Sequence, residues 1–366
     1  MSLQKAEDLY HKALKYDSTF AKAYTGLAMV YWDKHISKEY FTKNFMDSVR
    51  ILINFALSFD NQLSEAYTLR GRYYSEIGKP EQAIEEFDKA IKLNPNDWIA
   101  YKGKGDFYFA NNFVNSINYL QKAVSINRGR ELPSLLGDIA YVYLSAGFPD
   151  KSKQCYQDKL KLDGDSLAYY AGLQNDELWV GNFNKSIEYG EKGYVIDSTN
   201  DLILLNLGHN YAFLGQFKES LKYYKKWLER LKAQGEINLN NMYRIGYAYW
   251  QCGYKEEAEY CFNEQVEYCN RSIELKRWYG NIANYDLAAV SAFKGERDKA
   301  YKNLRIFDQR LSKALWIPQI MLIRTDPFFD SIRNEPEFKQ IVKDVEIKNQ
   351  AEHERVRKWL EKQGML

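Results

Sequence analysis

A glycine recurs along this chain in the same local setting, after one helical pattern and before a short polar start such as QFKES. The glycines in this setting are Gly78, Gly147, Gly181, Gly215, Gly253 and Gly295. Gly147, Gly181 and Gly215 are spaced 34 residues apart, and Asn111–Asn112 stands midway between Gly78 and Gly147. Glycine tolerates best the left-handed backbone that ends a helix, and Asn is the next most tolerant residue. The spacing therefore predicts a repeated helix–turn unit.

A second marker falls between these glycines, where an amphipathic pattern ends in Asp or Asn. These residues are Asp17, Asp60, Asn94, Asn127, Asp163 and Asp197. Small or polar residues follow each one, and then a new apolar pattern begins. Because Asp and Asn favour helix caps, we expect each to end one helix and to cap the next. Two helices per period predict a helix–turn–helix repeat.

Within one period, large and small residues alternate in a fixed order. In residues 63–96 this order reads Tyr67, Gly71, Tyr74, Ala83, Phe87, Ala90 and Pro95. Small residues let two antiparallel helices approach, and large ones fill the gaps between them. The order resembles that of the tetratricopeptide-repeat (TPR) family. The resemblance implies an all-α fold, namely a right-handed α-solenoid (superhelix) of stacked antiparallel helix pairs.

The phase of the repeat divides the chain into a front piece, a run of full units and a cap. Residues 1–20 are expected to form the second helix of a truncated repeat. About eight TPR units are expected at 21–63, 64–97, 98–132, 133–166, 167–200, 201–234, 239–272 and 281–314. Residues 315–366 are expected to form a C-terminal helical cap and a charged tail helix. Because a lone half-unit leaves an apolar face uncovered, the chain reads as part of a longer one, with a natural capping helix as the alternative.

The C-terminal sequence is punctuated by proline. Residues 326–338 read DPFFDSIRNEPEF, in which Pro327 and Pro336 suit the first turn of a helix. This ending resembles the TPR arrays of bacterial winged-helix regulators and of TPR-linked adenylate cyclases, although neither a winged-helix nor a cyclase motif occurs here. The resemblance implies the sensing or assembly region of a larger bacterial signalling protein.

Composition and charge narrow the function classes. The net charge is +2 and no Lys/Arg cluster stands out, so we expect this chain itself to bind no nucleic acid. The 4 cysteines form no CxxC pair, which is typical of reduced thiols in the cytoplasm. No apolar stretch is long enough to span a membrane. We therefore expect a cytoplasmic protein.

Motifs of catalysis, metal binding and cofactor binding are absent from the sequence. No HExxH, P-loop, GxSxG or EF-hand pattern occurs, and the 4 histidines are far apart. We therefore expect a non-enzymatic scaffold with no cofactor and no metal.

The expected binding surface follows from the TPR resemblance, in which the first helix of each unit lines the concave face. In the later units the residues at these positions are aromatic: Trp179, Phe213, Tyr243, Tyr247, Trp250, Tyr285 and Phe293. Aromatic residues are frequent anchors of protein interfaces. Packing between adjacent units is the alternative for each ring. The expected peptide-binding groove comprises Asn175, Trp179, Asn206, His209, Tyr243, Arg244, Tyr247 and Trp250.

A chaperone-tail site is a narrower possibility. TPR domains that bind the C-terminal carboxylate of chaperones use Lys and Asn, then Asn, then Lys and Arg from three successive first helices. The matching residues here are Ala171, Asn175, Asn206, Asn240 and Arg244, so both lysines are missing. The loss weakens attraction for an acidic tail, and it leaves open a role for Asn175, Asn206 and Arg244 in clamping an extended peptide.

Self-association is the alternative to peptide binding. The charged tail places Val356, Trp359 and Leu360 on one side of a helix, which could pair with another copy of the chain. The sequence thus predicts a protein or peptide partner, with a homo-oligomer as the alternative.

Overall fold

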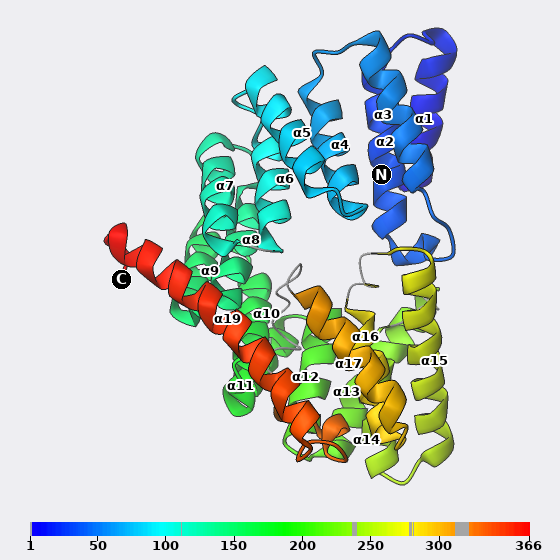
Figure 1. Cartoon of the computed structure of the whole chain (residues 1–366), viewed down its shortest axis with the longest axis vertical. Helices are drawn as coiled ribbons and strands as arrows, with labels where there is room; N and C mark the ends of the chain where they lie inside the picture. The colour runs from blue at the N-terminus through cyan, green and yellow to red at the C-terminus, as the bar shows by residue number, and fades with distance from the viewer. Residues whose placement is uncertain (1, 111, 236–239, 278–279, 281, 312–321) are drawn as a thin grey trace. The chain divides into compact units, whose positions relative to one another are not determined.

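A computed structural model describes residues 2–110, 112–235, 240–277, 280, 282–311 and 322–366 (Figure 1). Within these ranges the chain is helical, with turns between helices and no strand. Successive helices pack in antiparallel pairs. The predicted all-α solenoid of helix pairs is confirmed.

The chain forms two compact units. The first contains residues 1–135 and a short segment that begins at Leu275. Its helices are α1 (Leu3–Tyr16), α2 (Ala21–Ile36), α3 (Met46–Phe59), α4 (Ser64–Glu76), α5 (Pro80–Leu93), α6 (Trp98–Phe109) and α7 (Phe113–Ile126), with the 3-10 turn η1 (Lys38–Tyr40) between α2 and α3. Helix α8 (Leu132–Ser145) begins at the end of this unit.

The second unit contains residues 136–274 and the rest of the C-terminal part, to Leu366. Its helices are α9 (Pro149–Asp163), α10 (Ser166–Trp179), α11 (Phe183–Ile196), α12 (Asp201–Phe213), α13 (Phe217–Ala233), α14 (Met242–Gln251), α15 (Lys255–Glu274), α16 (Ala283–Phe293), α17 (Arg297–Leu311) and α19 (Pro336–Lys362), with the 3-10 turn η3 (Pro327–Phe329). Helix α19 continues without a break from the cap into the tail. Residues 312–321 lie outside the described ranges, and the division into repeat units stays a prediction.

The predicted glycine turns are left-handed. The φ angles of the six glycines lie between 73° and 86°: Gly78, Gly147, Gly181, Gly215, Gly253 and Gly295. A residue with a Cβ adopts this conformation only at a cost, so glycine is required there. Of the Asn pair, Asn111 lies outside the described residues, and the Asn112 side chain caps α7 by accepting from the Asn115 N–H at 3.0 Å.

The Asp and Asn markers end their helices, but they do not cap the next ones. The side-chain oxygen of Asp60 accepts from the N–H of Gln62, two residues on, at 2.9 Å. The same bond recurs at Asp17, Asn94, Asn127, Asp163 and Asp197. In this Asx turn the side chain of the Asp or Asn bonds within the loop between the two helices, so it cannot cap the next helix. A different residue takes the N-cap position, such as Leu63 before α4. The expectation of a shared cap was wrong.

Close packing within the helix pairs depends on small residues. A Cβ added at Gly208 would lie 2.4 Å from the Tyr224 ring, and one added at Gly71 would lie 2.9 Å from the Phe87 ring. The Ser220 hydroxyl donates to the Gly208 carbonyl oxygen at 2.8 Å, which ties α12 to α13. These contacts explain why the pattern alternates small and aromatic residues.

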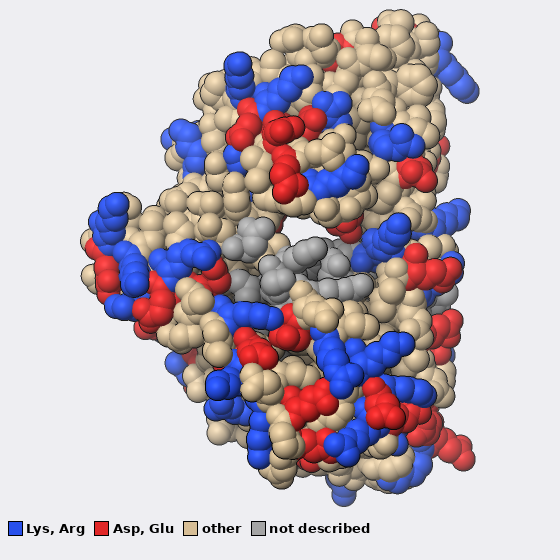
Figure 2. Space-filling model, in the orientation of Figure 1, with Lys and Arg blue, Asp and Glu red and all other residues tan. Residues whose placement is uncertain are grey.

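Outer helix faces carry ion pairs. Figure 2 shows acidic and basic side chains intermingled on the face it presents. One pair joins Lys294 Nζ to Glu259 Oε2 at 2.6 Å. Another joins Arg324 to Glu346 of α19 at 2.6 Å. Exposed pairs of this kind contribute little to stability, about 0–1 kcal/mol each, so the core carries the fold.

The carboxyl of Asp176 is buried in the second unit beside a hydroxyl. Asp176 on α10 accepts a hydrogen bond from the Ser152 hydroxyl of α9 at 2.5 Å. Burial raises the pKa of Asp176 to about 7, although the Ser152 bond opposes the shift. An acid whose pKa is higher in the folded state than in the unfolded state stabilises the fold at low pH. That contribution is lost as pH rises toward the folded pKa.

We expect Asp176→Asn to remove this pH dependence. Each unit of pKa difference corresponds to about 1.4 kcal/mol, so the wild-type chain should lose about 2–3 kcal/mol relative to the variant between pH 5 and pH 8. Urea unfolding of both proteins at the two pH values measures the difference. Parallel stability curves would show that Asp176 does not titrate in this range.

Candidate protein-binding site

The eight predicted groove residues lie on three first helices of the second unit, α10, α12 and α14. On α10, Asn175 and Trp179 are half-buried, and the indole N–H of Trp179 donates to Asn175 Oδ1 at 3.0 Å. The ring of Trp179 remains partly exposed at the end of its helix, where a partner can reach it.

Asn206 lies deep in the packing of α12. It is 2% exposed, and its main-chain oxygen accepts from the Asn210 side chain at 2.7 Å. Asn210 also donates to the Ser186 hydroxyl of α11 at 2.8 Å. Asn206 therefore belongs to the contact between neighbouring helix pairs and is closed to a partner from outside.

Arg244 of α14 is paired within the chain. Its Nη2 donates to Asp326 Oδ2 at 2.9 Å, and the Tyr285 hydroxyl donates to the same oxygen at 2.8 Å. The Arg244 side chain is 9% exposed and that of Asp326 is 0% exposed. In this structure Arg244 therefore binds a carboxylate of its own chain, that of Asp326.

Burial and pairing set the ionisation of this cluster. Burial by itself would lower the pKa of Arg244, but the charge of Asp326 raises it well above its usual value. Burial also raises the pKa of Tyr285 and of Tyr243, so both phenols stay neutral. The result is a buried ion pair with neutral hydroxyl donors beside it.

Phe328 of η3 sits in a cluster of rings from the inner helices. Its ring centroid lies 5.0 Å from that of Tyr243, 5.2 Å from that of Tyr247 and 5.5 Å from that of Phe293. Phe328 is 1% exposed and Tyr243 is 2% exposed. Tyr243 was expected either to bind a partner or to pack between adjacent units. The structure shows that it packs within the chain.

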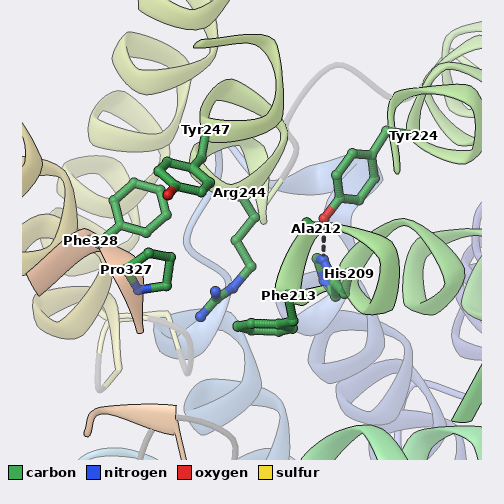
Figure 3. Close-up of a pocket in the computed structure, with 8 residues that line it drawn as sticks. All are labelled: His209, Ala212, Phe213, Tyr224, Arg244, Tyr247, Pro327 and Phe328. Carbon is green, nitrogen blue, oxygen red and sulfur yellow. Dashed lines mark hydrogen bonds between the residues drawn. The ribbon is translucent and has the colours of Figure 1, made fainter. Parts of the chain in front are cut away.

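A small pocket with about 20 Å³ of space, partly open to solvent, lies beside this cluster (Figure 3). It is lined by His209, Ala212, Phe213, Tyr224, Arg244, Tyr247, Pro327 and Phe328. Three of the predicted residues, His209, Arg244 and Tyr247, therefore share one pocket. The other five do not line it.

His209 and Tyr224 form one wall of the pocket. His209 Nδ1 lies 2.5 Å from the Tyr224 hydroxyl, as the dashed line in Figure 3 marks. Burial lowers the pKa of His209 well below its usual value and raises that of Tyr224. Both are therefore neutral near pH 7, and the wall is polar without carrying charge.

Tyr247 and Trp250 are half-buried near the end of α14. Lys255 Nζ lies 3.2 Å from the Trp250 ring centroid, and the Phe293 ring packs edge-on against the indole at 5.5 Å. Each ring keeps part of its surface exposed. Together with Trp179, they are the predicted aromatic groove residues that the structure leaves partly exposed.

Sequence reasoning missed the part of Asp326, Pro327 and Phe328 in this site. The sequence marks Asp326-Pro327 as a helix opening, which η3 bears out. No local pattern indicates that this opening meets Arg244, 82 residues earlier. The available signal was the aromatic pair Phe328-Phe329 after the proline, because two adjacent apolar rings are expected to be buried against other residues.

The tail predicted to pair with another copy packs on its own chain. Val356 and Leu360 are buried, and Trp359 is half-buried. Over the described ranges, all four cysteines are free, no group of His, Cys, Asp or Glu side chains could hold a metal ion, and no helix could span a membrane.

Known proteins share the repeat. One tetratricopeptide-repeat family model matches residues 64–97, and a second matches residues 203–230 and 239–277. The chain therefore contains TPR repeats, in both units. TPR proteins are generally scaffolds for protein interactions and are generally not enzymes.

Two curated relatives are TPR proteins of greater length. The chain is 27% identical to BBSome complex member BBS4 of Bos taurus over 150 residues, 41% of this chain and 28% of that protein. It is 24% identical to tetratricopeptide repeat protein 6 of Homo sapiens over 209 residues, 56% of this chain and 38% of that protein. The chain thus matches less than two fifths of either relative.

A solved structure of similar fold is the human IFIT1 dimer with PPP-AAAA. Its TM-score is 0.51 at 14% sequence identity, covering 84% of this chain and 68% of that one. At this identity the likeness shows the fold alone. The neighbours thus agree with the helix-pair architecture, while the bacterial winged-helix and cyclase context has no support among them.

Proposed function

We propose that this chain is a protein-binding TPR scaffold that holds an extended segment of a partner along α10, α12 and α14. The pocket formed by His209, Arg244 and Tyr247 carries the proposal, because it lies on the first helices of successive pairs. Solenoids use such stacked helices as extended binding surfaces.

The pocket and the half-exposed rings suggest how the partner is held. The pocket has about 20 Å³ of space, which is room for about one water-sized group. It would therefore accept only the tip of a small side chain of the partner. The rings of Trp179 and Trp250 would contact residues on either side of that anchor. The side chain of Asn175, beside Trp179, offers an amide to the partner's backbone.

Trp250→Ala and Trp179→Ala are the variants that test this surface. Arg244→Ala is unsuitable, because it would strand the buried Asp326. A peptide selected from a random display library against the wild-type chain serves as the probe. We expect each tryptophan variant to bind it at least tenfold more weakly, equivalent to about 1.4 kcal/mol. Fluorescence polarisation with the labelled peptide measures the affinity.

Tyr260→Ala is the matched control, because this ring is exposed on α15, which supplies none of the predicted groove residues. It should leave the affinity unchanged. Unchanged affinity in both tryptophan variants, or recovery of no peptide that the wild-type chain binds, would contradict the proposed groove.

We further propose that the scaffold is the sensing or assembly region of a bacterial cytoplasmic signalling protein. The support is the resemblance of the DPFFDSIRNEPEF ending to the TPR arrays of such regulators. The reading frame upstream of Met1 tests this context. A DNA-binding or cyclase module encoded there is expected, and a frame that encodes neither would oppose it.

A further inference from the structure

Helix α19 has two buried stretches separated by an exposed one. The first comprises Phe338, Ile341, Val342 and Val345, and the second comprises Glu352, Val356 and Leu360. No residue of 346–351 is buried. Between the two stretches, Glu346 and Lys348 make polar contacts with Arg324 and Asp308, so the two buried stretches pack on separate surfaces.

The first stretch is held by the last helix pair and the cap. The Phe338 ring packs on Phe329 at 5.3 Å between centroids. Lys348 Nζ donates to Asp308 Oδ1 of α17 at 2.7 Å. This stretch closes the end of the solenoid, as the proline-punctuated cap was expected to do.

The second stretch packs on a helix pair far upstream in the sequence. His353 stacks on Phe148 at 4.6 Å with 10° between the rings, and its Nδ1 lies 2.8 Å from the Ala146 carbonyl oxygen. Lys151 of α9 donates to the Met365 carbonyl oxygen. Figure 1 shows α19 running from η3 toward α9. The tail thus binds the turn between α8 and α9.

The end of α8 is covered on every side. Val142, Tyr143, Leu144, Ser145 and Ala146 are all buried. Five consecutive buried residues exceed the 3.6 residues of one turn, so no side of this turn faces solvent. The corresponding ends of α10 and α12, at Trp179 and Phe213, stay half-exposed. An extra element therefore covers the end of α8, and α19 makes contact there.

The cover that α19 supplies is small. Its buried aliphatic side chains are Val356 and Leu360, three and seven residues after His353. This spacing places them on the same side of the helix as the ring that stacks on Phe148.

Two ion pairs within the tail support its helix. Arg357 Nη1 pairs with Glu361 Oε1 at 2.6 Å, four residues on, and Arg357 Nη2 pairs with Glu354 Oε2 at 2.8 Å, three residues back. Such pairs stabilise an isolated helix. After release, residues 349–366 would present Val356 and Leu360 on one side of an amphipathic helix.

We propose that the end of α8 and the α8–α9 turn form a helix-binding site, which the chain's own residues 349–366 occupy. A partner helix with apolar residues four positions apart, like Val356 and Leu360 of the tail, competes for this site and displaces the tail. The site is separate from the pocket at Arg244. The proposal therefore goes beyond the proposed groove and stands or falls independently of it.

Two glycine variants test whether the tail is held there. A Cβ at Gly147 would lie 2.8 Å from His353 Nδ1, whereas a Cβ at Gly181 meets nothing within 4 Å. Their φ angles are 81° and 83°, so alanine strains both turns alike. We expect Gly147→Ala to speed hydrogen exchange of amides 352–362 at least tenfold relative to Gly181→Ala. Equal exchange in the two variants would overturn the seating of the tail.

A labelled peptide of residues 349–366 tests the site itself. The full chain carrying Val356→Asp and Leu360→Asp should release its tail and bind this peptide at least tenfold more tightly than the wild-type chain, whose site is occupied. A peptide with the same two substitutions is the control and should bind neither chain. A folded double variant that exposes its tail to exchange, yet binds the peptide no better than wild type, would overturn the proposal.

Discussion

Asp326→Ala is expected to lower the free energy of unfolding of the second unit by about 3–5 kcal/mol, because it leaves a buried guanidinium without its partner. Arg244 and Tyr285 both donate to the same Asp326 oxygen, and the other oxygen accepts from the Phe328 N–H at 3.3 Å. The variant thus leaves three hydrogen-bond donors without their acceptor. Urea unfolding, followed by circular dichroism, measures the loss.

Asp330→Ala is the matched control for this prediction. Asp330 also pairs with an arginine, Arg333, but its side chain is 67% exposed. Removing an exposed pair should cost about 0–1 kcal/mol. Adding Arg244→Met to Asp326→Ala should restore part of the stability, because it removes the stranded charge. A loss below about 1 kcal/mol for Asp326→Ala would contradict the buried pair as a stabilising contact.

Phe328→Ala is expected to cost about 3–5 kcal/mol, the usual range for removing a buried aromatic ring. Phe328 contacts Tyr243, Tyr247 and Phe293, which come from α14 and α16. The cavity would open beside an existing pocket, so those rings would lose packing on two sides. Urea unfolding at constant pH measures the cost.

Phe328→Leu tests whether the cost of Phe328→Ala comes from lost packing volume or from release of the η3 segment. Leucine fills most of the space and should cost less than half as much as alanine. The peptide assay adds a second readout, because Phe328 lines the pocket. If Phe328→Ala changed neither the free energy of unfolding nor peptide affinity, the ring cluster would hold neither the segment nor the pocket.

The repeat architecture could be predicted because its signals are local. Gly208 is small because Tyr224 packs against it, and Gly215 adopts a left-handed backbone because α12 must end there. Both requirements act within one helix pair. The periodicity therefore reported the helix pairs, the turns and the residues that pack between helices.

The contents of the site could not be predicted in the same way. Arg244 was expected to meet a partner, yet it meets Asp326, and no spacing rule links residues 82 positions apart. The docking of His353 on Phe148 spans more than 200 residues. Which returning segment covers an inner surface depends on the tertiary path of the chain. Helix periodicity does not predict that path.

The two C-terminal contacts change the expected groove. Arg244 and Tyr243 are committed to η3, so the surface left for a partner consists of Trp179, Trp250 and the pocket at His209. Because Phe328 of η3 packs on Tyr243 of α14 and Phe293 of α16, these helices already accept a segment of this chain. A partner would extend a mode of binding that the chain uses on itself.

Site-specific photo-crosslinking locates a bound peptide on the surface of the chain. A benzophenone side chain at position 179 or 250 is expected to crosslink the display-selected peptide, because both positions border the proposed groove. The same group at position 195, where Val195 is 86% exposed on α11, serves as the outer-surface control. Crosslinking at 179 and 250 but not at 195 is the predicted result. Equal crosslinking at all three positions, or crosslinking at 195 alone, would contradict the account.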